Sequence, residues 1–317
     1  MFDHILVPLD GSTLAECVLP HIVKMSPILS SRVTLVHVLK QSYGAGLNVP
    51  DPLEWHLRKT RALSYLGGVS ERLKAVGLDV SSRLLEGDPA QQIIEFARVQ
   101  RVDLILLSSH GQGGISGWNI SSVVQKIIFR THLSILIVRA YNPQPEALEG
   151  LRYRRLLLPL DGSKRAERIL PLATALSRER GSQMLLVHVV QHPTLFQQAH
   201  PTKQDLKLTR QLTQRNQQQA DRYLSRLKTQ LPANGRVHFW VAKDVPVALH
   251  QFVVQENVDL VVMSAHGHSA QAHWPFGSIA TNAIMYGSVP LLIVQDLTPE
   301  EMVPSPAELA QREHKGH

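Results

Sequence analysis

The sequence predicts an α/β protein made of two doubly wound domains in tandem, each with a five-stranded parallel sheet. Two observations lead to this prediction. Residues 5–20 and 156–171 are nearly the same, and short apolar runs alternate with helical patterns along both halves of the chain. Near-continuous apolar strands that alternate with helices indicate a parallel sheet with both faces covered. We expect a Rossmann-like strand order of 3-2-1-4-5 in each domain.

The duplication runs through each half of the chain. ILVPLDGSTLAECVLP at residues 5–20 matches LLLPLDGSKRAERILP at 156–171, VTLVHV at 33–38 matches MLLVHV at 184–189, VDLILLSSHG at 102–111 matches VDLVVMSAHG at 258–267, and SILIVR at 134–139 matches PLLIVQ at 290–295. The offset of 151 residues early in the repeat and 156 later is too long for a solenoid and suits two domains of ordinary size. The predicted domains are residues 1–140 and 153–296, joined by a linker at 141–152 and followed by a polar C-terminal tail at 297–317.

The elements of the first repeat follow in order. The apolar run from His4 to Leu9 ends in Asp-Gly-Ser and leads into apolar residues at helical spacing from Ala15 to Val23, which predicts a strand, a turn and a helix. The later elements are a strand at 32–39, a helix at 61–76 ended by Gly77, a strand at 79–85, a helix at 90–100, a strand at 103–108, a helix at 122–131 and a strand at 134–139. The second repeat keeps this order, with strands predicted near 155–160, 184–190, 236–242, 259–264 and 290–295.

Composition favours a compact intracellular protein. With 44% hydrophobic and 19% charged residues, each half has enough apolar side chains for a core. No apolar run approaches the roughly 18 residues needed to span a bilayer, and residues 1–10 lack the pattern of a signal peptide. We therefore expect a cytoplasmic protein with no membrane partner.

The formal charge of +7 and the isoelectric point near 9.6 raise the question of nucleic acid binding. The basic residues are spread along the chain without interleaved aromatic residues, which favours a solvated surface over a specific nucleic acid site. Non-specific polyanion binding at low salt stays open. Cys17 is the only cysteine, and Arg168 stands at its place in the second repeat, so we interpret it as a packing residue rather than a nucleophile.

The residues at the carboxyl ends of the predicted strands are the ones repeated most closely. In a doubly wound sheet, ligands bind at those ends, near the point where the strand order reverses. The first, second and fourth strands of the two repeats end in three matched pairs of segments: 8–10 and 159–161, 37–38 and 188–189, and 108–111 and 264–267. We expect these segments to converge on one crevice per domain.

The segment after the fourth strand carries the most specific pattern. Nine residues separate Ser108-Ser-His-Gly111 from Ser121-Ser122, and nine separate Ser264-Ala-His-Gly267 from Gly277-Ser278, each pair lying at a predicted helix start. A small-residue turn with free N–H groups and the N–H groups of a helix start together provide two anion-binding points for a polyphosphate. The pattern is neither a Walker A loop nor the dinucleotide fingerprint G-x-G-x-x-G.

These motifs resemble those of the universal stress protein family, whose ATP-binding members show G-x-x-G-x9-G-[ST]. The resemblance covers about residues 2–140 and 153–296, so the chain looks like a tandem universal stress protein. It implies ATP as the ligand, with Mg²⁺ bound only through the phosphates. The residues that would line the adenine and ribose pocket are Pro8, Asp10 and Val38 in the first repeat and Pro159, Asp161 and Val189 in the second. Those that would hold the phosphates are Ser108, Gly111, Ser121 and Ser122, and Ser264, Gly267, Gly277 and Ser278.

The two repeats depart from the family pattern to different degrees. Both have serine in place of its first glycine, and the first repeat also has Ser121 in place of a later glycine. If that backbone must take a positive φ or touch a phosphate, a Cβ there costs about 1 kcal/mol or blocks the approach. The second repeat keeps Gly277 but has Lys243 where the first has Gly87, and this lysine either clashes with a nucleotide or reaches its phosphates. We expect the second repeat to hold the better ATP site.

Simpler structural interpretations exist for several of these residues. Asp10 and Asp161 are good turn formers as well as candidate ligands. We interpret four matched histidines as structural hydrogen-bonding residues, namely His37, His188, His110 and His266. Of the group His266, His268 and His273 only the first recurs, and His314 and His317 are isolated, so we expect no metal site. Trp118 and Trp274 match across the repeats and favour packing over stacking on adenine.

No catalytic constellation accompanies the predicted sites. The nucleophile elbow G-x-S-x-G is absent, and each predicted crevice has one repeated acid with no repeated basic partner. We predict a non-enzymatic ATP-binding protein of stress response or signalling, with a protein partner that the sequence does not identify. The alternatives are an adenylyl-transferring or ATP-hydrolysing enzyme on the same fold, and a dimerisation module with decayed nucleotide sites.

The duplication also predicts how the repeats associate. Members of the family commonly pair through their last strands. We therefore expect residues 135–138 and 291–294 to meet and to form an intramolecular pseudo-dimer. Further homo-oligomers stay open.

Overall fold

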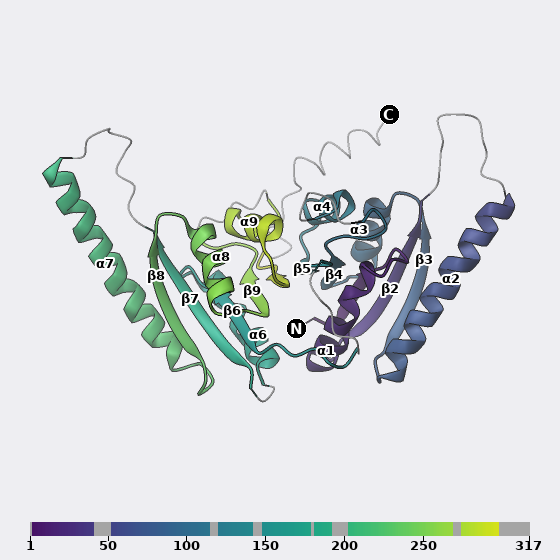
Figure 1. Cartoon of the computed structure of the whole chain (residues 1–317), viewed down its shortest axis with the longest axis horizontal. Coiled ribbons are helices and arrows are strands. Elements are labelled where there is room, and N and C mark those ends of the chain that lie inside the picture. Colours follow the sequence, from purple (N-terminus) through teal and green to yellow (C-terminus); the bar gives the residue numbers. More distant parts are fainter. Residues whose placement is uncertain are drawn as a thin grey trace. The chain divides into compact units, whose positions relative to one another are not determined.

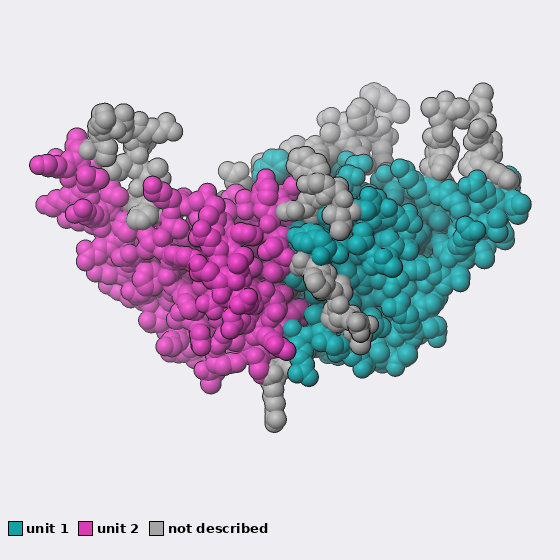
Figure 2. Space-filling view, viewed as in Figure 1, with its two compact units in different colours: residues 1–152, 271–276, 290–317 teal, residues 153–270, 277–289 magenta. Residues whose placement is uncertain are grey.

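A computed structural model describes residues 2–40, 52–114, 120–141, 148–178, 181–191, 202–268 and 274–297. The chain forms two compact units (Figure 2). Unit 1 comprises residues 1–152, 271–276 and 290–317, and unit 2 comprises residues 153–270 and 277–289. Outside the described residues lie Trp118, His273, His314 and His317, residues 142–147 of the predicted linker and residues 298–317 of the predicted tail.

Unit 1 contains the elements of the first repeat in the predicted order (Figure 1). They are β1 (His4–Pro8), the 3-10 helix η1 (Ala15–Val18), α1 (Leu19–Leu29), β2 (Arg32–Leu39), α2 (Pro52–Ala75), β3 (Val80–Glu86), α3 (Pro89–Val99), β4 (Leu104–Ser108), α4 (Ser122–Ile128) and β5 (Ser134–Val138). These strands pair in parallel in the order β3-β2-β1-β4-β5. The predicted order 3-2-1-4-5 is therefore confirmed.

A further strand of unit 1 comes from the second repeat. β10 (Leu291–Val294) pairs antiparallel with β5, with Leu291 opposite Ile137 and Ile293 opposite Ile135. The predicted meeting of the last strands of the two repeats is thus confirmed. The sheet of unit 1 is mixed rather than purely parallel.

Unit 2 contains the remaining elements of the second repeat. They are β6 (Arg155–Pro159), α5 (Lys164–Glu167), α6 (Leu170–Leu176), β7 (Gln183–Gln191), α7 (Lys203–Lys228), β8 (Arg236–Ala242), α8 (Val245–Gln255), β9 (Leu260–Ser264) and α9 (Ser278–Tyr286). The strands pair in parallel in the order β9-β6-β7-β8, which repeats the order of the first four strands of unit 1. The prediction of an α/β fold with two such repeats is confirmed.

Local signals in the sequence explain where several helices begin. Asp88 accepts a hydrogen bond from the backbone N–H of Gln91 at 3.0 Å at the start of α3, and Asp244 does the same for Val247 at 2.9 Å at the start of α8. At the start of α7, Thr202 forms a reciprocal capping box with Asp205. Such side chains satisfy N–H groups that have no partner inside the helix.

The long helices α2 and α7 pack on β2 and β3 and on β7 and β8, respectively. α2 begins at Pro52, well before the predicted start at residue 61. The apolar residues of its first turns, Leu53 and Leu57, are 65% and 46% exposed, so they do not follow the periodicity of a buried face. The prediction was wrong here because it relied on that periodicity.

The central strands carry the core of unit 1. Every residue of β4 and of β5 is buried. This explains why the sequence shows continuous apolar runs there instead of alternation, as expected for strands covered on both faces. Within the described ranges, no helix is long and apolar enough to cross a membrane.

Candidate functional site

The turn that follows the first strand of each repeat is built in the same way. Gly11 and Gly162 have φ values of 86° and 88°, a backbone conformation that glycine adopts without steric cost. The preceding aspartate then turns back onto the chain, so that Asp10 Oδ1 accepts from Ser12 N at 3.0 Å and Asp161 Oδ1 accepts from Ser163 N at 2.9 Å. Asp-Gly-Ser therefore forms a turn in both units. This agrees with the interpretation of Asp10 and Asp161 as turn formers.

The same aspartate also holds the loop that follows the fourth strand. Its second oxygen accepts from a backbone N–H of that loop at 2.6 Å, from Gln112 in unit 1 and from His268 in unit 2. A Cβ placed on Gly111 would lie 1.9 Å from Oδ2 of Asp10, and one placed on Gly267 would lie 2.0 Å from Oδ2 of Asp161. The glycine of each loop thus lies directly against the carboxylate, which brings these predicted site residues together.

These contacts determine the ionisation of Asp161. Burial raises the pKa of its carboxyl group, but hydrogen bonds from Ser163 and from the His268 backbone, with the charge of the His268 side chain, outweigh burial and lower it. The carboxylate is accordingly the favoured form. Each oxygen of a carboxylate has two lone pairs, so Asp161 can accept further hydrogen bonds from a ligand.

The loop after the fourth strand leads back to a helix start. In unit 1 the N–H of Ser121 donates to the carbonyl of Ser109 at 2.8 Å, and in unit 2 the N–H of Gly277 donates to the carbonyl of Ala265 at 2.8 Å. The start of α4 and the start of α9 therefore lie beside the turn that contains the loop glycine. The structure brings the two predicted anion-binding points of each repeat together.

The two helix starts differ in their caps. Ser121 Oγ accepts from the N–H of Val124 at 3.4 Å and so caps α4, whereas Gly277 offers no side chain to α9. The φ values at these positions are −71° and −69°, so Ser121 carries no backbone strain. The idea that this position needs a positive φ was wrong, because both residues are in extended conformations that any residue adopts.

Ser108 and Ser264 at the ends of the fourth strands are buried. Ser108 Oγ lies 2.8 Å from the carbonyl of Leu14 and 2.6 Å from that of His110, so its hydroxyl bonds within the protein. The Oγ of Ser264 is buried without a hydrogen-bond partner among the described residues. The hydroxyl of Ser108 is therefore committed to the protein rather than offered to a phosphate.

Cys17 lies beside Ser108, with Sγ at 3.3 Å from its Oγ. Burial raises the pKa of the Cys17 thiol to about 11. A thiol is a poor nucleophile when it stays protonated, so the interpretation of Cys17 as a packing residue agrees with its surroundings.

The strand register aligns the other predicted site residues. Pro8 of β1 pairs with Val36 of β2, and Pro159 of β6 pairs with Val187 of β7, so Val38 and Val189 follow at the same edge of each sheet. The four apolar residues of the predicted pockets, Pro8, Val38, Pro159 and Val189, are half-buried. Together with the aspartates they form one cluster per unit at the carboxyl ends of the strands.

The histidine before Val189 has a structural partner in the backbone. His188 Nδ1 lies 2.8 Å from the carbonyl of Leu160, and since a carbonyl only accepts, Nδ1 carries the proton. In unit 1, burial lowers the pKa of His37, while the carbonyl of Leu9 and the charge of Asp10 partly oppose this effect. His110 Nδ1 lies 3.0 Å from Ser109 Oγ. Within the described ranges, no group of three His, Cys, Asp or Glu side chains is placed to hold a metal ion.

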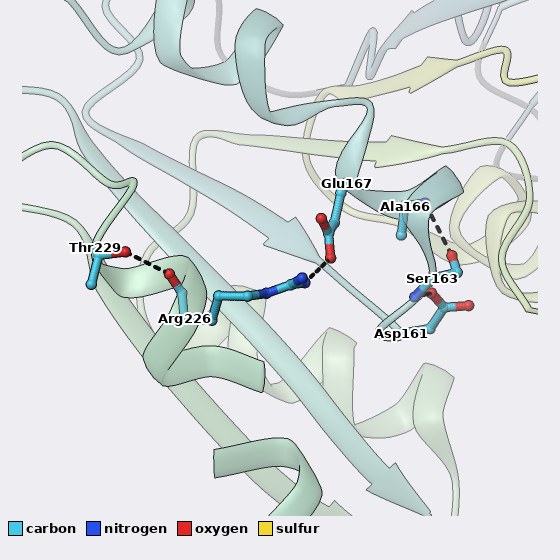
Figure 3. A network of polar contacts seen from close by, with 6 residues as sticks. All are labelled: Asp161, Ser163, Ala166, Glu167, Arg226 and Thr229. Carbon is cyan, nitrogen blue, oxygen red and sulfur yellow. Dashed lines mark hydrogen bonds and ion pairs between the residues drawn. The ribbon is translucent and has the colours of Figure 1, made fainter. Parts of the chain in front are cut away.

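A second layer of polar residues behind the cluster escaped the sequence analysis. In unit 2, Glu167 of α5 forms an ion pair with Arg226 of α7 at 2.6 Å (Figure 3). Glu167 follows Ser163, the N-cap of α5, by four residues. Arg226 lies over the ring of Tyr223, whose centroid is 5.7 Å from that of His188. Burial raises the pKa of Tyr223, and the charges of Glu167 and Asp161 raise it further.

Unit 1 repeats this layer with Glu16, Arg72, Tyr65 and His37. Glu16 and Arg72 lie 2.8 Å apart, and the rings of His37 and Tyr65 are 6.3 Å apart. The signal was present in the sequence, because Ala-x-x-Tyr-Leu recurs at 62–66 and 220–224 and Ala-Glu recurs at 15–16 and 166–167. The arginines were harder to find, since Arg72 follows its tyrosine by seven residues and Arg226 by three.

Comparison with known proteins finds relatives for both halves of the chain. The family model described as the Universal stress protein family matches residues 1–139 and 152–295. Universal stress protein MJ0531 of Methanocaldococcus jannaschii is 27% identical over 44% of this chain and 83% of its own length. Universal stress protein Rv2005c of Mycobacterium tuberculosis is 21% identical over 92% of this chain and 96% of its own length.

Solved structures show the same fold over nearly the whole chain. A universal stress protein from Archaeoglobus fulgidus superposes with a TM-score of 0.63 at 16% identity and covers 93% of this chain and 98% of its own. PA1789 of Pseudomonas aeruginosa gives a TM-score of 0.67 at 13% identity, covering 99% of this chain and 98% of its own. The chain belongs to the universal stress protein family and carries two family domains in tandem.

Proposed function

We propose that the chain is a non-enzymatic universal stress protein that binds ATP in unit 2 and acts in stress response or signalling. The observation that carries this proposal is the start of α9, a nine-residue helix that has Gly277 in place of a capping side chain. The first N–H groups of a helix need partners from outside the helix, and its positive dipole end favours an anion. No acidic residue lies in the first turn of α9 to oppose a phosphate.

The rest of the proposed ATP site follows from the loop and strand ends of unit 2. Ser264 ends the fourth strand, Gly267 lies in the loop that follows it, and Ser278 adds a hydroxyl at the first position of α9. Asp161, Pro159 and Val189 would line the adenine and ribose pocket, with the ionised Asp161 accepting hydrogen bonds from the ligand. Mg²⁺ would be held through the phosphates.

The surroundings of the site favour binding over catalysis. The carboxylate of Asp161 accepts hydrogen bonds from Ser163 and His268, which lower its pKa and make it a weak base. General base catalysis needs a group within hydrogen-bond reach of the proton that it removes, and hydrolysis also needs charge neutralisation at the transferred phosphate. An adenylyl-transferring or ATP-hydrolysing activity therefore ranks second.

The pairing of β5 with β10 supports an intramolecular pseudo-dimer of the repeats through their last strands. It also suits the second alternative, a dimerisation module without a ligand. A nucleotide titration separates the two.

Isothermal titration of the full chain with ATP and Mg²⁺ tests the proposal. We expect saturable binding that weakens strongly in the variant Gly267→Ala, whose Cβ would collide with Asp161. If the full chain gave no heat of binding, the dimerisation module without a ligand would explain the protein better. Release of phosphate or pyrophosphate from labelled ATP faster than in buffer would replace the binding protein with an enzyme.

A further inference from the structure

The two strand-end clusters are alike where a base and ribose would bind. Asp10 and Asp161 each accept a backbone hydrogen bond from the loop at 2.6 Å, and each lies against a loop glycine. The glycines that follow these aspartates, Gly11 and Gly162, have φ values of 86° and 88°. Pro8 and Pro159, at the ends of the first strands, are both half-buried. These hydrogen bonds, glycine contacts and turn conformations are common to the two units.

The clusters differ where phosphates would bind, and each difference favours phosphate binding in unit 2. Ser121 Oγ already accepts from the third N–H of α4, so it occupies the place that a phosphate oxygen would take, whereas the start of α9 has no such cap. α4 has seven residues and α9 has nine, so α4 aligns fewer peptide dipoles toward its start.

Two neighbouring positions have more basic side chains in unit 2 than in unit 1. The residue whose N–H holds the aspartate is Gln112 in unit 1 and His268 in unit 2. The residue that follows the third strand is Gly87 in unit 1 and Lys243 in unit 2. Unit 2 thus gains basic side chains at both positions, while unit 1 keeps neutral ones.

We propose that unit 1 binds an adenine nucleoside or nucleoside monophosphate and excludes polyphosphate, so that one chain holds two different adenine ligands. This inference rests on the proposed function, because it takes the strand-end cluster to be an adenine site. A base and ribose need only the end that the two units share. A triphosphate also needs the uncapped helix start and the basic neighbours, which unit 2 alone combines.

A reciprocal exchange in the full chain tests the inference. Ser121→Gly removes the cap in unit 1, and Gly277→Ser adds one in unit 2. Titration with ATP, AMP and adenosine gives the number of sites and the affinity for each ligand. We expect the unaltered chain to bind two molecules of AMP but one of ATP. The variant Ser121→Gly should bind a second ATP at least tenfold more tightly than the unaltered chain does. The variant Gly277→Ser should lose about tenfold in ATP affinity.

The binding of AMP serves as the internal control for folding, because neither exchange touches the end of the site that AMP shares with ATP. A Cβ at Gly277 would lie 3.3 Å from the carbonyl of Ala265, a tight contact that the AMP affinity of unit 2 would reveal if it disturbed the loop. Gly113→Ser is the matched control in the loop of unit 1, where a Cβ meets nothing within 4 Å.

The outcomes separate this inference from the proposed function. Two equivalent ATP sites in the unaltered chain, or one ATP and one AMP site only, would overturn the inference and leave ATP binding intact. An unchanged second ATP affinity in Ser121→Gly would overturn it as well. Absence of heat with all three ligands would overturn both.

Discussion

Oδ2 of Asp161 lies 2.0 Å from the point that a Cβ on Gly267 would occupy, and Oδ2 of Asp10 lies 1.9 Å from the same point on Gly111. Neither of these loop glycines has a positive φ. The loop therefore needs glycine because a carboxylate packs on it, and not because of its backbone conformation. The aspartate and the glycine, which lie about a hundred residues apart in sequence, are one structural unit.

Gly111→Ala should destabilise unit 1, because its Cβ forces the Asp10 carboxylate away from Gln112. We expect a loss of about 1–3 kcal/mol in the free energy of unfolding, as for overpacking combined with a lost hydrogen bond to a charge. Urea denaturation measures it. Gly113→Ala is the control, since its Cβ has open space and should change stability by less than about 0.5 kcal/mol. Equal losses in the two variants would contradict the steric explanation.

Asp161→Asn should lower the free energy of unfolding at neutral pH but not in acid. The pKa of Asp161 is lowered in the folded chain, so its ionised form stabilises the fold above the ordinary pKa of about 4, and this stabilisation is lost as the pH falls through the lowered value. Because the side chain of Asp161 is exposed, solvent screens its charge, and we expect the variant to be less stable than the unaltered chain at pH 7 by less than about 1 kcal/mol. The gap should narrow at pH 3 in urea denaturation, and a gap that stays constant would mean that charge is not involved.

His21 should make the chain sensitive to mild acid. Burial lowers the pKa of His21 to about 3, and the side chain is 2% exposed. As the pH falls below about 6.5, the imidazole of His21 is protonated in the unfolded chain before it is protonated in the folded chain. The free energy of unfolding therefore falls by about 2 kcal/mol between pH 7 and pH 5, with a limiting slope of about 1.4 kcal/mol per pH unit.

His21→Leu tests this with a residue that the second repeat itself uses, Leu172. The variant should lose less stability than the unaltered chain between pH 7 and pH 5 in paired urea titrations. Parallel curves for the two proteins would show that another group causes the acid sensitivity.

The ion pair between Glu167 and Arg226 should contribute little to stability despite its 2.6 Å length. The side chain of Arg226 is 60% exposed, so solvent screens the pair, and we expect a coupling energy below about 1 kcal/mol. A double-mutant cycle with Glu167→Gln and Arg226→Gln measures it by chemical denaturation. A coupling above about 2 kcal/mol would show that the layer behind the site is a major stabilising element.

Ile137→Lys should unfold or strongly destabilise unit 1. Ile137 is fully buried on β5 and lies opposite Leu291 of β10. Burying an unpaired charge there should cost about 3–5 kcal/mol. Val99→Lys, at a site that is 61% exposed in the same unit, is the control and should cost less than about 0.5 kcal/mol in thermal or urea unfolding. If Ile137→Lys matched this control, the pairing of β5 with β10 would be wrong.

The sequence predicted the parts of the fold that depend on local pattern and repetition. Buried strands such as Leu104–Ser108 appear as continuous apolar runs, and their alternation with helices predicted the doubly wound class and with it the strand order of unit 1. The start of α2 was missed because its first leucines are exposed, and no periodicity of a buried face marks them.

Long-range relationships at the site were harder to predict. The motifs placed Asp161 and Gly267 at strand ends, but only the structure shows that the carboxylate packs on the glycine. Glu167 stands at the same place in its repeat as Glu16, but Arg226 and Arg72 do not stand at equivalent positions, so comparison of the copies could not reveal the ion pairs. Ser121 was suspected for backbone strain, whereas the structure shows a negative φ there and a hydroxyl that caps α4.

The strand β10 has one further consequence. It belongs by sequence to the second repeat, yet its contacts assign it to unit 1. A fragment that stops at Arg152 would keep β5 but lack this partner, and five buried residues would then form an open sheet edge. Such an edge pairs readily with another copy of itself. Proteolytic separation of the halves should therefore produce aggregation or self-association instead of two independent monomers, and the gene duplication has created a protein that can no longer be divided at its own repeat boundary.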